Sequence, residues 1–288
     1  MKFQRRVFPW LMVSPTFLVL ALFLIYPLVS LLLMSTRDYG SSIVNYTDVG
    51  LQWYRMLPDD PRFVNGLWRT LIYSGGSVIG AMLLGTIMAF LLNRNYPGVA
   101  AVRTLFILPM ISMPVASALM WGTMFNPNQG ILNYLLESVG LERSLWLASP
   151  NTALASIMIV EIWMSSPFVM LIVLAGLRSM PSEPLESAQI DGANKLQLFL
   201  YVMLPMLRAA LATAALFKII DTLKQFPIIW VLTKGGPLRA TETLYVYGYA
   251  LGFQFFDLGY GAAILVVLLL IVMIISVFWM GLRQRQWL

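Results

Sequence analysis

The residues best placed to do chemistry are polar and ionisable side chains inside two long apolar stretches. Four of them recur at i, i+3, i+4 and i+7, a spacing that puts them on one stripe of a helix: Lys218, Asp221, Thr222 and Gln225. In the second stretch, Ser165 follows Glu161 by one helical turn, and Met164 lies between them. The chain contains no histidine and no cysteine. Imidazole and thiol chemistry is therefore excluded, and with it the commonest catalytic bases and metal ligands.

These charges are expected at similar depths in the membrane-spanning helices predicted below. Asp221 would lie about 18 Å and Glu161 about 13 Å into its helix, near the middle of a hydrocarbon core of roughly 30 Å. A charge that faces lipid there costs at least about 2.5–3.5 kcal/mol, so the charged groups should face the protein interior. Two interpretations stay open: a buried ion-pair network of Glu161, Lys218, Asp221 and Lys224 that locks the helices, or a water-filled cavity that binds a polar solute. The neighbouring hydroxyl and amide groups favour the cavity.

The mixture of carboxylates, amides and hydroxyls suits a polyhydroxylated ligand. Carboxylates accept hydrogen bonds from sugar hydroxyls, and apolar rings cover the C–H face of a sugar. Trp121, Trp163 or Phe226 could supply such a stacking surface. An ion channel is disfavoured because the stripe mixes both signs of charge, whereas a selectivity filter repeats one.

The composition places these groups in a polytopic membrane protein. Of 288 residues, 59% are hydrophobic and only 11% are charged, and the mean hydropathy is +0.77, which does not suit a soluble globular surface. We predict an all-α bundle, a single transmembrane domain over residues 1–288, because six apolar stretches each reach the roughly 20 residues that cross a hydrocarbon core. These stretches lie near 9–34, 70–92, 104–125, 152–176, 209–232 and 260–282.

The distribution of basic residues predicts the orientation. Lysine and arginine are more numerous in the two termini and the even-numbered connections, and the short connection 93–103 holds Arg94 and Arg103 without any acid. By the positive-inside rule, both termini and the connection 178–208 are expected in the cytoplasm.

The connection 178–208 is built unlike an ordinary linker. Pro184 and Glu186 suit the first turn of a short helix, and Asn194 suits the cap of a second one. Asp191 and Gly192 between them suit a sharp turn. Two short helices joined in this way would form a rigid protrusion, and a plain re-entry into the next span is the alternative.

This connection resembles the EAA motif of binding-protein-dependent ABC-transporter permeases, most closely the carbohydrate-import branch typified by maltose-type permeases. The resemblance rests on the run Glu186-Ser187-Ala188-Gln189-Ile190-Asp191-Gly192-Ala193, followed by Phe199 and Leu204-Pro205. Supporting matches are Trp163 with Pro167-Phe168, and Gly235-Gly236-Pro237 after the fifth stretch. Together the matches cover roughly residues 48–282.

The resemblance implies roles for two sets of residues. A cytoplasmic coupling helix would contact the ATPase through Glu186, Ser187, Ala188, Asp191, Gly192 and Ala193. The substrate pathway would be lined by Glu161, Met164, Ser165, Lys218, Asp221, Thr222 and Gln225. The sequence departs from the family where Ser187 replaces alanine, and where Lys218 and Asp221 are charged instead of neutral polar or aromatic. The two charges leave the identity of the substrate open.

The resemblance also implies the setting of the chain. It would be a subunit in a bacterial-type inner membrane, surrounded by lipid and paired with a second, related permease in a heterodimer. A dimer of ATP-binding cassette ATPases and an extracytoplasmic solute-binding protein would complete an importer that moves a sugar or sugar derivative by alternating access. The chain has no GxxxxGK[ST] phosphate loop, so we expect no cofactor here, and ATP and Mg would be used by the ATPase.

Other functions are weaker alternatives. Lys218 and Lys224 would also suit an anionic solute, such as a glycerol or sugar phosphate or a sulfonate. An ion-coupled secondary carrier would use Glu161 and Asp221 to bind protons or cations, but the sequence shows no convincing internal repeat. An enzyme is disfavoured because no nucleophile–base pair or metal cluster is present. Nucleic acid is not an expected partner, since the basic residues are scattered through short loops.

Overall fold

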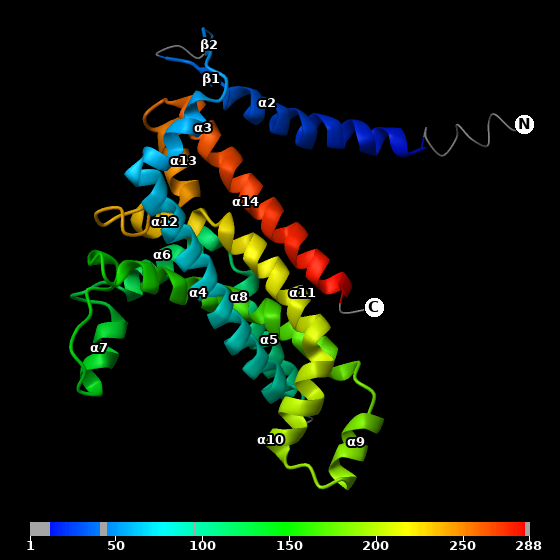
Figure 1. Ribbon diagram of the computed structural model, residues 1–288. Coiled ribbons are helices and arrows are strands. Elements are labelled where there is room, and N and C mark those ends of the chain that lie inside the picture. The colour runs from blue at the N-terminus through cyan, green and yellow to red at the C-terminus, as the bar shows by residue number, and fades with distance from the viewer. Residues whose placement is uncertain (1–11, 41–44, 95, 286–288) are drawn as a thin grey trace, which may run out of the picture. The chain divides into compact units, whose positions relative to one another are not determined.

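The computed structural model describes residues 12–40, 45–94 and 96–285. The described chain is almost entirely helical, and its two strands form one short antiparallel ladder (Figure 1). The α-helices are α2 (Tyr26–Met34), α3 (Gln52–Met56), α4 (Pro61–Leu92), α5 (Val99–Ile111), α6 (Pro114–Met124), α7 (Ile131–Ser138), α8 (Ala153–Arg178), α9 (Glu183–Ile190), α10 (Lys195–Gln197), α11 (Leu204–Leu223), α12 (Pro227–Thr233), α13 (Leu244–Phe253) and α14 (Leu258–Arg285). The remaining elements are the π-helices η1 (Ala21–Ile25) and η4 (Leu198–Met203), the 3-10 helices η2 (Leu57–Asp59) and η3 (Trp146–Ala148), and the strands β1 (Arg37–Asp38) and β2 (Thr47–Asp48).

Within the described residues, five helices are long and apolar enough to cross a membrane, and one bent pair brings the number to six. The single helices are Met12–Met34, Pro61–Leu92, Ala153–Arg178, Lys195–Leu223 and Leu258–Gly281, and the pair is α5 with α6. The all-α, polytopic fold class is therefore confirmed. The start of the first predicted stretch, residues 9–11, lies outside the described residues.

The third predicted stretch, 104–125, differs most from a simple span. Helix α5 ends at Ile111, α6 begins at Pro114, and the two are bent by 97°. Ser112 and Met113 are extended, with ψ of 146° and 129°. Pro114 explains the conformation of Met113, because a proline ring clashes with a helical residue directly before it. The Ser112 hydroxyl lies 2.6 Å from the carbonyl oxygen of Pro109 and so satisfies a backbone acceptor near the break.

The chain divides into two compact units, the first formed by residues 1–64 and 247–269 and the second by residues 65–246 and 270–288. In the second unit, α4 and α8 pack closely through small residues of α4. A Cβ added at Gly85 would lie 2.6 Å from the Cβ of Val169, and Ala81 is fully buried. The small residues at positions 76–85 therefore allow close packing of the two helices.

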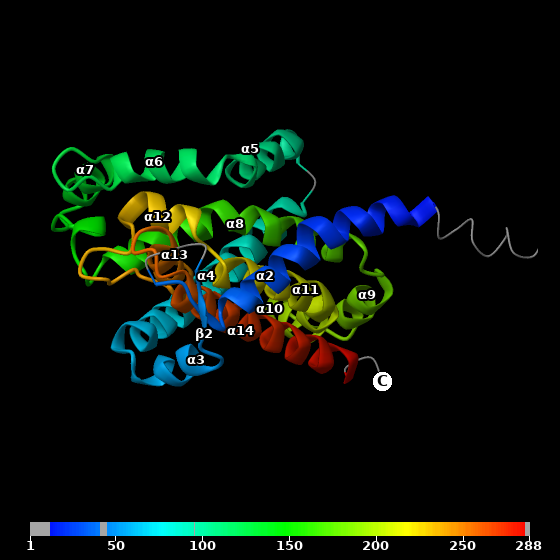
Figure 2. The same ribbon diagram turned by 90° about the horizontal axis from the view of Figure 1, so that it is seen from above.

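Helix α8 lies next to α11 in the same unit, with α5 and α6 along its other side (Figure 2). The apolar core between these helices includes Met170 and Val173 of α8 with Leu207 of α11. The last part of α14 joins this unit through the Trp279 indole, which donates to the carbonyl of Ala212 at 3.0 Å. This packing positions the middle of α8 against the end of α11, where the polar side chains lie.

The first unit is held together around one carboxylate. Asp60 precedes α4, and its Oδ2 accepts hydrogen bonds from Tyr247 at 2.8 Å and Tyr260 at 2.7 Å. Its Oδ1 accepts the backbone N–H of Arg62 at 2.8 Å and so caps the first turn of α4. One side chain therefore links the starts of α4 and α14 to α13.

Candidate functional site

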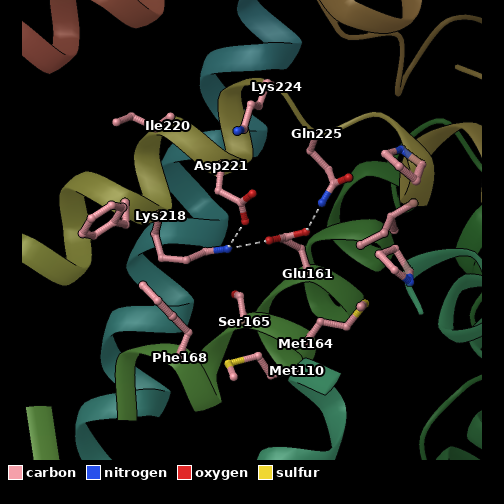
Figure 3. Close-up of a pocket in the computed structure, with 14 residues that line it drawn as sticks. Met110, Glu161, Met164, Ser165, Phe168, Lys218, Ile220, Asp221, Lys224 and Gln225 are labelled. Atoms are coloured by element: carbon pink, nitrogen blue, oxygen red, sulfur yellow. Dashed lines mark hydrogen bonds and ion pairs between the residues drawn. The ribbon is translucent and has the colours of Figure 1, made fainter. Parts of the chain in front are cut away.

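A cavity of about 570 Å³ opens in the second unit where α8, α11 and the start of α12 meet. One side of its lining is polar and the other is apolar (Figure 3). The lining residues are Met110, Pro114, Glu161, Met164, Ser165, Phe168, Phe217, Lys218, Ile220, Asp221, Lys224, Gln225, Pro227 and Ile228.

An ion-pair network forms the floor of the cavity. Lys218 Nζ lies 2.9 Å from Glu161 Oε1 and 2.7 Å from Asp221 Oδ2. Glu161 Oε2 also accepts from Gln225 Nε2 at 2.7 Å and from the hydroxyl of Tyr73 at 3.3 Å. The Glu161 and Lys218 side chains are only 3% and 5% exposed. This pair is therefore a structural link between α8 and α11 whose charges are already compensated.

The rim of the cavity is different, because its polar groups are accessible. The Asp221 side chain is 55% exposed, and one of its oxygens bonds Lys218. Lys224 is exposed and lines the same cavity, and no ion pair to it is found within the described residues. Ser165 Oγ is buried in the wall without a hydrogen-bond partner in the described part of the chain. The exposed Asp221 and Lys224 can contact a solute, whereas the Glu161–Lys218 pair cannot do so without breaking its own contacts.

A break in the helix forms part of this rim. The sequence predicts one span over 209–232, but α11 ends at Leu223 and α12 begins only at Pro227. Phe226 has φ of −128° and ψ of −52°, outside the helical region, as the residue before a proline often is. Gln225 bridges the break, since its Oε1 accepts from the N–H of Phe226 while its Nε2 donates to Glu161. Non-helical backbone within a membrane span is tolerated where it lines a cavity.

Six of the seven predicted pathway residues line the cavity: Glu161, Met164, Ser165, Lys218, Asp221 and Gln225. The structure places Thr222 elsewhere, because its hydroxyl lies 2.7 Å from Ser74 Oγ of α4 and its side chain is buried. The aromatic lining also differs from the prediction. Trp121 packs on Trp163 at 5.6 Å between ring centroids and neither lines this cavity.

The lining also includes residues outside the predicted pathway set: Met110, Pro114, Phe168, Phe217, Ile220, Lys224, Pro227 and Ile228. Tyr73, which was not predicted either, reaches the Glu161 carboxylate from α4. Tyr73 lies on another helix, and its spacing carries no signal that it would reach Glu161. Phe217 could have been found, because it falls at i−4 from Asp221 on the same helix face. Lys224 was considered from the sequence for an ion-pair network or an anionic solute, and the structure places it in the cavity lining.

The connection 178–208 contains the helix, turn and second helix that its sequence predicts. Helix α9 ends in a Schellman motif: Ala193 N–H donates to Ala188 O at 2.9 Å, and Gly192 N–H donates to Gln189 O at 3.1 Å. Gly192 has φ of +83°, a left-handed conformation that favours glycine. A capping box at Asn194 starts α10. The segment extends beyond the ends of α4 and α8 (Figure 1).

The predicted coupling residues lie on this accessible segment. Glu186, Ser187, Asp191 and Gly192 are exposed, and Ala188 and Ala193 are half-buried. The side of α9 that carries Ile190, which is 86% exposed, presents an apolar group to the outside. Such a rigid and accessible surface is suitable for contact with another protein.

Comparisons with known proteins agree with this architecture. Residues 81–287 match the family described as the inner membrane component of binding-protein-dependent transport systems. The chain is 35% identical over 267 residues to a probable ABC transporter permease of Pyrococcus horikoshii, covering 92% of this chain and 91% of the relative. It is 31% identical to the trehalose/maltose transport system permease MalF of Thermococcus litoralis, covering 96% and 92%. It is also 32% identical to the sulfoquinovosyl glycerol transport system permease SmoG of Agrobacterium fabrum, covering 94% and 88%.

A solved structure shares the fold. A chain of a bacterial alginate ABC transporter, in complex with a periplasmic protein bound to alginate pentasaccharide, superposes with a TM-score of 0.84. That alignment covers 99% of this chain and 96% of the other at 24% identity.

Proposed function

This chain belongs to the family of inner membrane components of binding-protein-dependent transport systems, and from that premise we propose that it imports a sugar or sugar derivative through the cavity between α8 and α11. It is the permease subunit of an ABC importer and not an enzyme, because a separate ATPase hydrolyses ATP in this family. A solute-binding protein and an ATPase are the partners that the family implies.

The observation that carries the proposal is the accessible rim of the cavity. Asp221 and Lys224 are exposed at a cavity of about 570 Å³, which is enough for a small ligand. A merely structural network would not need the exposed carboxylate or the helix break beside it. The trehalose/maltose and sulfoquinovosyl glycerol relatives support a sugar or sugar derivative as the solute.

We propose the connection 178–208 as the surface that contacts the ATPase. Glu186, Ser187, Ala188, Asp191, Gly192 and Ala193 would form that contact, because they lie on the rigid α9 and its glycine turn. ATP and Mg would be bound by the ATPase dimer. A second, related permease would complete the pathway, and both termini would lie in the cytoplasm. Closure of the ATPase would then move the two permeases together as rigid bodies between outward-open and inward-open states.

Uptake by the complete assembly in vesicles tests the class of transport. Uptake should require hydrolysable ATP and should survive collapse of proton and sodium gradients. Uptake that persists without ATP and stops with the gradients would reject the proposal in favour of an ion-coupled carrier.

A second candidate is import of an anionic solute, which Lys224 favours as a cavity-lining cation with no ion pair in the described residues. A relative supports it: the sn-glycerol-3-phosphate transport system permease UgpA of Agrobacterium fabrum is 30% identical to this chain. Identification of the solute bound to the purified binding protein separates the two candidates.

A further inference from the structure

One face of α11 presents an aromatic ring, a carboxylate and an ammonium group in order along the cavity. Phe217, Asp221 and Lys224 fall at i, i+4 and i+7, and all three line the cavity. Phe217 is 54% exposed. The Asp221 side chain is 55% exposed. This exposed face is distinct from the buried Glu161–Lys218 pair below it.

The hydrogen-bonding groups of Glu161 and Lys218 are already occupied, so the exposed face of α11 is the part of the cavity that can contact a solute. Both Glu161 oxygens accept hydrogen bonds, and Lys218 donates to two carboxylates. Phe217 contacts Phe168 edge-to-face, with 6.1 Å between centroids and 84° between planes, so the pair itself leaves ring faces uncovered. Asp221 follows Phe217 by four residues, about 6 Å along the helix axis, so the two side chains lie on the same face of α11.

Charge balance decides between a neutral and an anionic solute. The cavity is lined by two carboxylates, Glu161 and Asp221, and two ammonium groups, Lys218 and Lys224. A neutral solute preserves this balance, whereas an anion would add an uncompensated charge inside a membrane span. Lys224 also stands at the carboxyl end of α11, where the helix dipole already favours a cation and disfavours a nearby anion.

We propose that Phe217 is the stacking platform for a neutral sugar ring, whose hydroxyls donate to Asp221. The electropositive C–H face of the ring lies against the electron-rich face of Phe217. This assignment rests on the proposed function of the cavity and narrows its substrate class to neutral glycosides. Lys224 balances the charge of the site instead of selecting an anion.

The test uses the complete transporter in vesicles and a defined mixture of four probes: trehalose, maltose, sulfoquinovosyl glycerol and sn-glycerol 3-phosphate. ATP-driven accumulation in the vesicle lumen is measured by mass spectrometry, and KM and maximal rate are then measured for each accumulated probe. The variants are Phe217→Tyr, which keeps the ring, and Phe217→Leu, which keeps an apolar side chain without one. Phe278→Leu is the matched control, because Phe278 is 66% exposed on α14 and does not line the cavity.

We expect a neutral disaccharide to accumulate and the two anions to be excluded. Phe217→Leu should raise KM about tenfold with the maximal rate within about twofold, because stacking contributes to uniform binding. Phe217→Tyr and Phe278→Leu should stay within about twofold of the wild-type KM. Co-purification of the ATPase with each variant verifies that the assembly is intact.

Other outcomes would separately overturn the neutral substrate class, the stacking role of Phe217, or the cavity as the solute site. Accumulation of only the anionic probes, or of none of the four, would overturn the neutral class. An unchanged KM in Phe217→Leu, with a raised KM in Asp221→Asn, would overturn the platform and leave the cavity in place. If neither variant changed KM, the cavity itself would be rejected as the solute site.

Discussion

The ammonium group of Lys218 lies 2.9 Å from Glu161, a residue 57 positions earlier on a different helix. The pair is almost completely buried, and Lys218 also reaches Asp221 on its own helix. Two charges taken out of water in this way are stable only while each keeps its partner. The pair therefore fixes α8 against α11 at the level of the cavity.

Removal of one partner of this pair should be strongly destabilising. Lys218→Met should lower stability by about 3–5 kcal/mol, because it leaves the Glu161 carboxylate buried without its cation. Thermal unfolding of the purified assembly measures the change. The exposed Lys224 provides the control, and Lys224→Met should stay within about 0.5 kcal/mol of the wild type. Equal losses in the two variants would contradict a structural role for the Lys218–Glu161 pair.

The sequence predicted this meeting of charges better than it predicted their surroundings. Counting residues from the ends of the apolar stretches puts Glu161 and Asp221 at one depth, and the cost of a lipid-facing charge turns both inward. The direction in which each side chain points was harder to predict from the sequence. At 100° per residue, Thr222 lies on the opposite edge of the stripe from Asp221, and it faces Ser74 of α4. Phe217 and Lys224 line the cavity and Thr222 does not, so the cavity-lining face is rotated from the predicted stripe.

Breaks in the helices were also only partly predictable. The extended Met113 follows from the proline after it, but the size of the bend, 97°, cannot be predicted from the neighbouring residues alone. The turn at Gly192 was predictable because its chemistry is local: a left-handed glycine and an asparagine cap specify it without distant contacts. Features that depend on a neighbouring helix, such as Tyr73 at Glu161, have no comparable local pattern.

The glycine turn after α9 should be required for association with the ATPase. Gly192→Val places a branched side chain at φ of +83°, a conformation that costs about 1–2 kcal/mol for ordinary residues. The Schellman hydrogen bonds should then be lost and the docking surface displaced. Co-purification of the ATPase measures the effect. Gly192→Asn is the control, because asparagine tolerates the left-handed region, and it should retain most of the association. Normal association of the valine variant would argue against docking at this turn.

Close packing of α4 on α8 should depend on Gly85 and not on Gly75. A Cβ at Gly85 would lie 2.6 Å from both Ser166 O and Val169 Cβ, whereas nothing lies within 4 Å of one at Gly75. Gly85→Ala should therefore cost about 1–3 kcal/mol through overpacking, and Gly75→Ala should be close to neutral. Both residues lie in the same helix, so helix propensity cancels in the comparison of unfolding temperatures. A neutral Gly85→Ala would show that the two helices can separate without loss.

The stability of the first unit should depend on pH through Asp60. Burial raises the pKa of its carboxyl, but hydrogen bonds from Tyr260 and Tyr247 and from the N–H of Arg62 lower it more, so the pKa lies below the ordinary 3.8. A depressed pKa means that the stabilisation is complete above the unfolded-state pKa and is lost as the pH falls through the folded-state value. The protection of the α13 amides from hydrogen exchange, relative to the intrinsic rate at each pH, should therefore fall on acidification below about pH 4.

Two variants isolate this contribution. Asp60→Asn should show lower protection of the α13 amides at neutral pH and a smaller further loss of protection on acidification, because the charged acceptor is absent at every pH. The adjacent Asp59 is exposed, and Asp59→Asn should follow the wild-type profile. The same acid dependence in Asp60→Asn and the wild type would assign the effect to another group.

Substitutions at the Ser74–Thr222 contact distinguish an effect on helix packing from an effect on solute binding. The two hydroxyls lie 2.7 Å apart and are buried, and Thr222 also donates to the carbonyl of Lys218 at 2.8 Å. Thr222→Val should leave the KM for the transported solute unchanged, because the side chain does not line the cavity. It should lower stability by about 1–3 kcal/mol, because the Ser74 hydroxyl loses its partner.

The double variant Ser74→Ala with Thr222→Val should recover part of that loss, since both polar groups are then removed together. Uptake and thermal unfolding of the single and double variants complete the cycle. A raised KM in Thr222→Val at unchanged stability would instead return Thr222 to the solute pathway.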